Sequence, residues 1–85
     1  MYQVLLPETF ARGAFIEAMQ ARGIGIGVHY PALHLFSLYR RLGFEPGDFP
    51  RAERVGGQTV TLPLFPAMSD ADVARVCCAV AEILK

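Results

Sequence analysis

The stretch TVTLPLFPAMSDADVARVCCAVAEILK, residues 59–85, places a strand pattern directly before a helix pattern. Residues 59–65 are rich in β-branched and apolar side chains, and Pro63 indicates that the strand ends early or lies at an edge. Ser69 followed by Asp72 three residues later is a capping-box arrangement, which marks the start of a helix. A strand that leads into an amphipathic helix predicts a domain in which helices cover a sheet.

The predicted C-terminal helix has an apolar face and two adjacent cysteines. The face comprises Val73, Val76, Cys77, Val80, Ile83 and Leu84. Because Cys77 and Cys78 are neighbours within a helix, their geometry is unsuited to an ordinary disulfide with each other. We expect reduced thiols, at least one of which faces the core, since a buried free cysteine behaves as a small hydrophobic residue.

The first third of the chain predicts a strand, a helix and a second strand. Residues 2–6 (YQVLL) form a β-rich run that stops at a proline. A helical repeat follows, with Thr9 as its N-cap and Gly23 as its stop. Residues 24–30 (IGIGVHY) alternate β-branched residues with glycine until Pro31, and we assign them to a strand that the glycines thin.

The middle of the chain predicts short helical pieces joined by turns. Residues 35–42 suggest a helix closed by Gly43, and Asp48 is placed to cap the helical turns of residues 51–57. The order of elements predicts an α+β fold: one small two-layer domain over residues 1–85, with a short three-stranded sheet packed by two main helices.

The composition predicts a domain with more apolar surface than it can bury alone. The chain has 85 residues, of which 53% are hydrophobic, and a domain this small buries only about 60% of its unfolded surface. We therefore expect some apolar side chains to face another domain or chain. Eight basic and eight acidic residues cancel without forming a basic run, which excludes nucleic acid as a partner. The absence of a signal peptide or a long apolar run predicts a cytoplasmic protein without membrane contact.

Residues 23–34, GIGIGVHYPALH, contain both histidines and are the main candidate for a functional site. The glycines follow a helix and enter a strand, whereas a phosphate loop needs the opposite order. A zinc site is disfavoured because no carboxylate or thiol lies near His29 and His34. Two imidazoles and the phenol of Tyr30 can donate hydrogen bonds to anionic oxygens or sugar hydroxyls, so a binding role and a structural role both stay open.

Two long segments together resemble a known enzyme family. RGIGIGVHYPALHLFSLYRRLG (residues 22–43) and GDFPRAERVGGQTVTLPLFPAMSDADVARV (residues 47–76) carry a GIG turn, an HY strand end, a P..H segment, an AE pair and an LPL.P turn, in that order. This series resembles the C-terminal part of pyridoxal-phosphate-dependent aminotransferases that act on nucleotide-linked sugars, the DegT/DnrJ/StrS type.

The resemblance implies the small C-terminal domain of the type I pyridoxal phosphate transferase fold. It implies a larger α/β domain that binds the cofactor, a homodimer with active sites at its interface, and transfer of an amino group, usually from glutamate, to a nucleotide-linked keto-sugar in polysaccharide biosynthesis. It places His29, with Tyr30 and His34, as substrate-binding residues. The same resemblance gives Glu53 and Arg54 a structural role, such as a salt bridge at a helix end.

The sequence departs from this family in one respect that concerns the chemistry. Schiff-base catalysis needs a lysine in a site that lowers its pKa, and the only lysine here is Lys85, the last residue. We therefore expect the chain alone to be inactive and to need the large domain. The alternative is a separate α+β module that kept the pattern and binds a small ligand. Which sugar and which carbon are aminated, and whether a dehydratase relative fits better, are not decided by these residues.

We predict that the isolated chain self-associates. Phe36, Phe44 and Phe65 are the side chains we expect to lie on an uncovered apolar face. Light scattering over a concentration series should show a mass that increases with concentration, and a monomer at the highest concentration would contradict the expectation.

Overall fold

The chain forms two strands, four α-helices and one short 3-10 turn in this computed structural model, which describes all of residues 1–85. In chain order they are β1 (Tyr2–Leu5), α1 (Arg12–Ala21), the 3-10 turn η1 (Leu33–Leu35), α2 (Ser37–Arg41), α3 (Pro50–Gln58), β2 (Thr59–Leu62) and α4 (Asp70–Ile83). None of the helices has the length and apolar character that crossing a bilayer requires.

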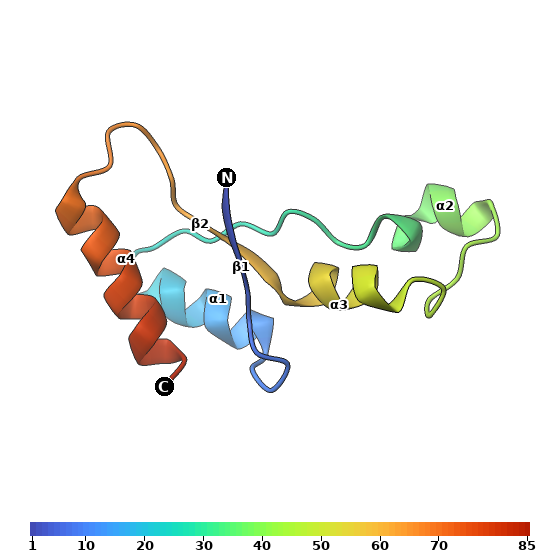
Figure 1. The fold of residues 1–85 in the computed structure, drawn as a ribbon, viewed down its shortest axis with the longest axis horizontal. Coiled ribbons are helices and arrows are strands. Elements are labelled where there is room, and N and C mark those ends of the chain that lie inside the picture. The colour runs from blue at the N-terminus through green and yellow to red at the C-terminus, as the bar shows by residue number, and fades with distance from the viewer.

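The molecule is elongated because only part of it surrounds a core. We call β1, α1, β2 and α4 the core lobe, and residues 31–58 the arm (Figure 1). The radius of gyration is 15.1 Å and the extents are 48 × 29 × 19 Å, whereas a compact chain of this length has a radius of gyration of about 12 Å. The arm, with α2 at its far end, accounts for this excess length.

The sheet has two strands, and a third segment joins it through a single bridge. β1 and β2 are antiparallel, with Gln3 opposite Thr61 and Leu5 opposite Thr59. On the other edge of β2, Thr61 exchanges two backbone hydrogen bonds with Gly27, of 2.7 and 3.1 Å. The three-stranded sheet expected from the sequence is therefore not confirmed. The physical reason is that the glycines of residues 24–30 supply no side chains that would hold a longer strand pairing.

One face of the sheet packs against α1 and α4, which lie side by side in the core lobe (Figure 1). Strand alternation places Val4, Val60 and Leu62 on this face, and Val60 is fully buried. The buried cluster comprises Leu6, Phe15, Met19, Ile24, Val60, Val76 and Ala79. The α+β arrangement of a small sheet covered by two main helices is thus present, in agreement with the sequence-based prediction.

The predicted C-terminal end of α1 is confirmed, but the predicted N-cap is not. After α1, the backbone N–H of Ile24 donates to the carbonyl of Met19 at 3.0 Å, and that of Gly23 donates to Gln20 at 2.9 Å. With Gly23 at a φ of 74°, this is a Schellman motif, so the predicted glycine stop is confirmed. Thr9 is not the N-cap: the cap is Ala11, without a side-chain hydrogen bond, because a turn through Phe10 delays the helix.

The two cysteines are both exposed, which corrects the expectation that at least one faces the core. The reason is the rotation of α4 about its axis. Val76 and Ala79, three residues apart, form its buried side, and Cys77 and Cys78 lie between them in sequence but to either side of that line. Val73 and Cys77 instead line an uncovered apolar groove beside β1.

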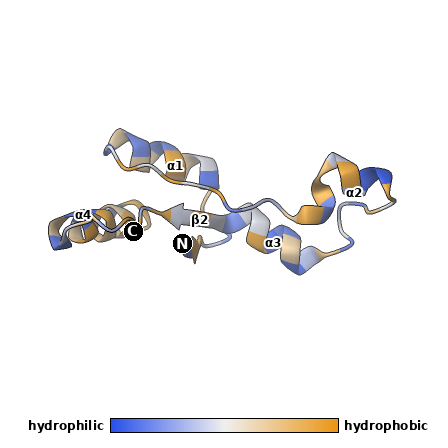
Figure 2. Cartoon of the chain, turned by 90° about the horizontal axis from the view of Figure 1, so that it is seen from above, coloured by the Kyte–Doolittle hydropathy of each residue, from blue (hydrophilic) through white to orange (hydrophobic).

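Apolar side chains are exposed along the arm as well. They are Leu33, Leu35, Phe36, Leu38, Leu42, Phe44, Phe49 and Val55. Figure 2 shows hydrophobic residues on α2 and on the turn before it, far from the core lobe. The expected exposure of Phe36, Phe44 and Phe65 is therefore present.

The arm joins the core lobe where two backbone segments cross closely. A Cβ atom on Gly56 of α3 would lie 2.6 Å from the backbone nitrogen of Ala32 and 3.1 Å from the carbonyl carbon of Pro31. The guanidinium of Arg12 donates to the carbonyl of Gly56 and so ties the crossing to α1. Only glycine permits this approach, because both contacts are with backbone atoms that cannot rotate away.

We predict opposite effects for two neighbouring glycine substitutions in α3. Gly56→Ala should lower the free energy of unfolding by about 1–3 kcal/mol, since the methyl group overlaps the crossing backbone. Gly57→Ala is the matched control, because its Cβ would meet no atom within 4 Å, and it should raise the free energy of unfolding by up to about 1 kcal/mol through helix propensity. Urea denaturation measures the free energy of unfolding of both variants. Equal effects would show that the backbone at Gly56 has room for a methyl group.

A second prediction concerns the start of α4, where the predicted capping box is confirmed. The Asp72 backbone N–H donates to Ser69 Oγ at 3.1 Å, and the Ser69 N–H donates to Asp72 Oδ2 at 3.0 Å. Ser69→Ala should lower the free energy of unfolding by about 1 kcal/mol. Ser37→Ala is the control, because α2 starts without a side-chain cap, and a loss as large as that of Ser69→Ala would contradict the assignment.

The same capping box makes stability depend on pH. The hydrogen bond from the Ser69 backbone lowers the pKa of Asp72 below its ordinary value of 3.8. Because this pKa is lower in the folded chain, the carboxylate stabilises the fold fully above pH 3.8, and this stabilisation is lost as the pH falls through the folded value. Asp72→Asn should remove that part of the acid sensitivity, as measured by the melting temperature between neutral and acidic pH.

Candidate functional site

His29 lies directly after the bridge to β2, on the face of the sheet opposite α1 and α4. Alternation along the strands puts Gln3 of β1 and Thr61 of β2 on this face. The imidazole Nδ1 of His29 is 2.8 Å from the hydroxyl Oγ1 of Thr61, and the side-chain amide of Gln3 donates to the His29 carbonyl. His29 is therefore held at its ring and at its backbone by two strands.

The ring of His29 also lies against Gly27. A Cβ atom at Gly27 would be 2.7 Å from Cε1 and 3.3 Å from Nδ1 of the imidazole. Gly27, which the sequence analysis describes as thinning the strand, thus makes room for the ring. Thr61 is a residue that sequence reasoning missed. Strand alternation from the core residue Val60 is the signal that could have identified it.

Tyr30 continues the same surface and is 66% exposed. Its ring packs edge-on against that of His29, with 4.9 Å between centroids and planes at 89°. The rings of His29 and Tyr30 are therefore in contact, and the substrate-binding role expected of them stays a prediction. Their adjacent rings offer an imidazole and a phenol to one ligand, both of which can donate hydrogen bonds.

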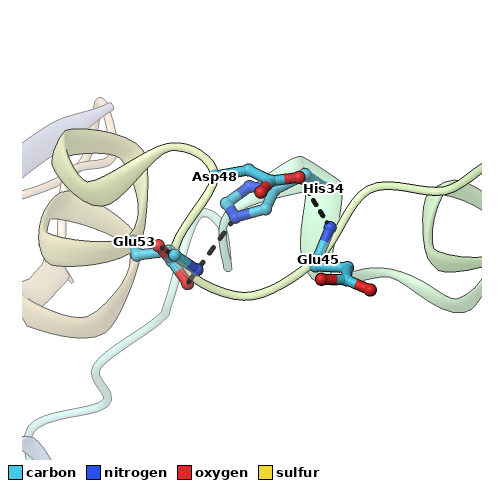
Figure 3. Close-up of polar contacts among 5 residues, drawn as sticks. His34, Glu45, Asp48 and Glu53 are labelled. Carbon is cyan, nitrogen blue, oxygen red and sulfur yellow. Dashed lines mark hydrogen bonds and ion pairs between the residues drawn. The ribbon is translucent and has the colours of Figure 1, made fainter.

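His34 lies apart from this pair, inside the arm, where it is only 6% exposed. Its Nε2 is 3.6 Å from Oε1 of Glu53 and has no partner at hydrogen-bond distance. Phe49 packs edge-on against the imidazole, at 5.0 Å between centroids. Figure 3 shows the His34 ring between the glutamate and the turn that carries Asp48. All of these contacts of His34 are with the arm itself.

Glu53 connects α3 to the preceding turn. Its two carboxylate oxygens accept from the backbone N–H of Gly47 at 2.9 and 3.0 Å. Asp48 does not cap α3 as the sequence suggested: its carboxylate accepts from the Glu45 N–H at 2.8 Å and closes the turn (Figure 3). The N-cap residue of α3 is Phe49, which makes no side-chain hydrogen bond to the helix. Asp48 precedes this position, and its carboxylate bonds to the turn before the helix instead.

The neighbouring arginine also makes an ion pair. Arg54 Nε is 2.7 Å from Oε1 of Glu8, and both side chains are largely exposed. The pair links α3 to the segment between β1 and α1, although exposed pairs of this kind contribute little stability. With His34–Glu53, it gives the structural contacts that the sequence analysis expected of the AER segment.

The residues of this chain do not form a pyridoxal phosphate site. A Schiff base needs a lysine held in a shielded setting, and Lys85, the single lysine, is exposed at the end of the chain after α4. No group of three or more His, Cys, Asp or Glu side chains that could hold a metal ion is present. The rings of His29 and Tyr30 carry groups that can donate hydrogen bonds, and neither group can form a Schiff base with the cofactor.

Comparison with solved structures gives the same fold over almost the whole chain. Spr1654 from Streptococcus pneumoniae, described as a sugar aminotransferase in its PMP form, is 28% identical with a TM-score of 0.86, covering 99% of this chain and 22% of its own. The aminotransferase TlmJ from Streptoalloteichus hindustanus is 31% identical with a TM-score of 0.74, covering 98% and 22%. This chain therefore corresponds to about a fifth of these proteins.

Sequence comparisons agree. An uncharacterized protein of Methanocaldococcus jannaschii, MJ1066, is 43% identical over 74 residues, which are 86% of this chain and 19% of that protein. The sequence pattern of the DegT/DnrJ/EryC1/StrS aminotransferase family matches residues 1–81. Together with the TM-score of 0.86 to Spr1654, this match shows that the chain belongs to the DegT/DnrJ/EryC1/StrS aminotransferase family.

Proposed function

We propose that the chain is the C-terminal small domain of a pyridoxal-phosphate-dependent aminotransferase that transfers an amino group from glutamate to a nucleotide-linked keto-sugar. The observation that carries this proposal is the family match over residues 1–81. A sugar aminotransferase with the same fold over 99% of the chain supports it. The full enzyme, not this chain alone, performs the reaction in our proposal.

His29 and Tyr30 are the substrate-binding groups of this domain in the proposal. They lie on the face that the helices leave uncovered, and their rings are in contact. A nucleotide sugar presents phosphate oxygens and hydroxyls, which accept hydrogen bonds from an imidazole N–H and a phenol O–H. His34, the third residue expected at the substrate, is buried in the arm beside Glu53, so we do not assign it to this surface.

The cofactor belongs to a large domain outside these residues. When bound, pyridoxal phosphate supplies the electron sink for transamination, and the exposed Lys85 gives this chain no group to anchor it. We further propose a homodimer with active sites at the subunit interface. The exposed apolar side chains of the arm support this, because such surface is typical of contacts with another domain or subunit.

The test is transamination by the enzyme translated from the complete native reading frame. Glutamate and a panel of nucleotide-linked keto-sugars are the substrates. His29→Ala should raise KM for the sugar about tenfold, which corresponds to the loss of one hydrogen bond to a charged group, with little change in kcat. Gln20→Ala, on the exposed side of α1, is the control and should leave both constants unchanged.

Two results would contradict the proposal. A native frame that encodes no large domain would favour the ligand-binding module over the enzyme. An unchanged KM for every accepted sugar in His29→Ala would remove this histidine from the substrate site. In parallel, the 85-residue chain incubated with pyridoxal phosphate and borohydride should gain no pyridoxyl adduct at Lys85 beyond that of a free amine.

A further inference from the structure

Three segments meet around His29: β1 through its backbone carbonyl, and β2 and Gly27 through its imidazole. Gln3 and Thr61 face each other across β1 and β2, and Gly27 pairs with Thr61 on the opposite edge. The ring of His29, two residues after Gly27, returns over that bridge to meet the Thr61 hydroxyl at 2.8 Å. Ring, hydroxyl and glycine therefore form one contact unit, which we call the His29 seat.

Thr61 is the fixed part of this seat. It is 9% exposed, and its backbone N–H and carbonyl are both used in the bridge, at 2.7 and 3.1 Å. As a β-branched residue it has few allowed rotamers. Its hydroxyl makes no hydrogen bond other than the one to His29 Nδ1. The Thr61 side chain thus makes one hydrogen bond, to His29, and the bridge to Gly27 holds its backbone in place.

Gly27 restricts the ring from below. A Cβ there would approach Cε1 to 2.7 Å, so the imidazole lies close against the glycine. The hydroxyl of Thr61 and the backbone of Gly27 both limit where the ring can lie. Its other nitrogen, Nε2, makes no hydrogen bond within the chain.

Nδ1 is the only hydrogen-bond partner of the Thr61 hydroxyl, so within the chain this hydroxyl can donate only if Nδ1 of the neutral ring is unprotonated. A neutral imidazole has one N–H donor and one acceptor nitrogen, and both nitrogens are donors in the cation. A threonine hydroxyl that donates to Nδ1 leaves Nε2 as the N–H group of the neutral ring. When the ring is charged, the hydroxyl turns and accepts from Nδ1–H, and Nε2 is again a donor. In both states the ring presents an N–H outward.

We propose that Thr61 is a positioning residue that fixes His29 as a hydrogen-bond donor through Nε2, and that Gly27 keeps the ring in that position. The ligand group it suits is an oxygen acceptor, such as a phosphate or hydroxyl oxygen, and not a proton to be abstracted. This inference rests on the proposed function only for the identity of the ligand. The protonation of the ring is a property of the chain itself.

The first test is long-range ¹H–¹⁵N NMR of His29 in the 85-residue chain at alkaline pH, where imidazole is neutral. We expect Nε2 to be protonated and Nδ1 to be unprotonated. Thr61→Val should shift the spectrum toward a mixture of tautomers, and Thr61→Ser should restore the original spectrum. A protonated Nδ1 in the unaltered chain, or an unchanged spectrum in Thr61→Val, would overturn the proposal.

A glycine pair keeps the test decisive if Thr61→Val does not fold. Gly27→Ala leaves the hydroxyl in place but pushes the ring off its position, so the His29 signals should move toward those of a free imidazole. Gly25→Ala is the matched control, because its Cβ would meet no atom within 4 Å, and its spectrum should be that of the unaltered chain. Equal spectra for Gly27→Ala and Gly25→Ala would contradict the proposal that Gly27 keeps the His29 ring in position.

The complete enzyme provides a separate readout. Thr61→Val should raise KM for the sugar substrate about as much as His29→Ala, with kcat retained and with Thr61→Ser close to the original enzyme. If His29→Ala raises KM and Thr61→Val does not, the positioning role fails. If neither His29→Ala nor Thr61→Val changes KM while the NMR spectra are as expected, the substrate contact of His29 is contradicted but the positioning of its ring by Thr61 is not.

Discussion

The four residues of β2 support both halves of the molecule. Its edges pair with β1 and with Gly27, and its faces carry Val60 into the core and Thr61 toward His29. It also follows α3 without an intervening loop, so the arm leaves the core lobe directly from this strand (Figure 1). A slip of one residue would exchange the two faces, placing a hydroxyl in the core and a valine under the histidine. The core and the candidate site therefore depend on one register.

The sequence predicted the elements whose signals are local. The capping box at Ser69 and the glycine stop at Gly23 are made by residues three or five apart, so their geometry follows from spacing alone. The extent of the third strand and the exposure of Cys77 could not be read this way, because both depend on how distant segments pack. The same holds for Thr61, whose partner is 32 positions away in the chain.

The arm shows how a segment can be shaped without a core. Its order comes from short polar connections, chiefly Glu53 to Gly47 and His34, and from the backbone crossing at Gly56. Many of its large apolar side chains are exposed, and none belongs to the buried core cluster. This accounts for the high mean hydropathy of +0.33 in so small a chain, since apolar residues that a core does not use can serve contacts with another domain or subunit.

In the proposed enzyme, His29 would contribute to substrate binding and not to the chemistry at the cofactor. In the proposed enzyme, the charge that develops during transamination would lie at the cofactor, which we assign to the large domain. In the proposed enzyme, His29 would make the same hydrogen bond to a remote phosphate or hydroxyl in the ground state and in the transition state. Binding of that kind lowers KM without raising kcat. Because Thr61 and Gly27 already contact the ring, binding would cost little further ordering of His29. In the proposed enzyme this domain would therefore contribute to substrate selection, and the domain that holds the cofactor would set the reaction rate.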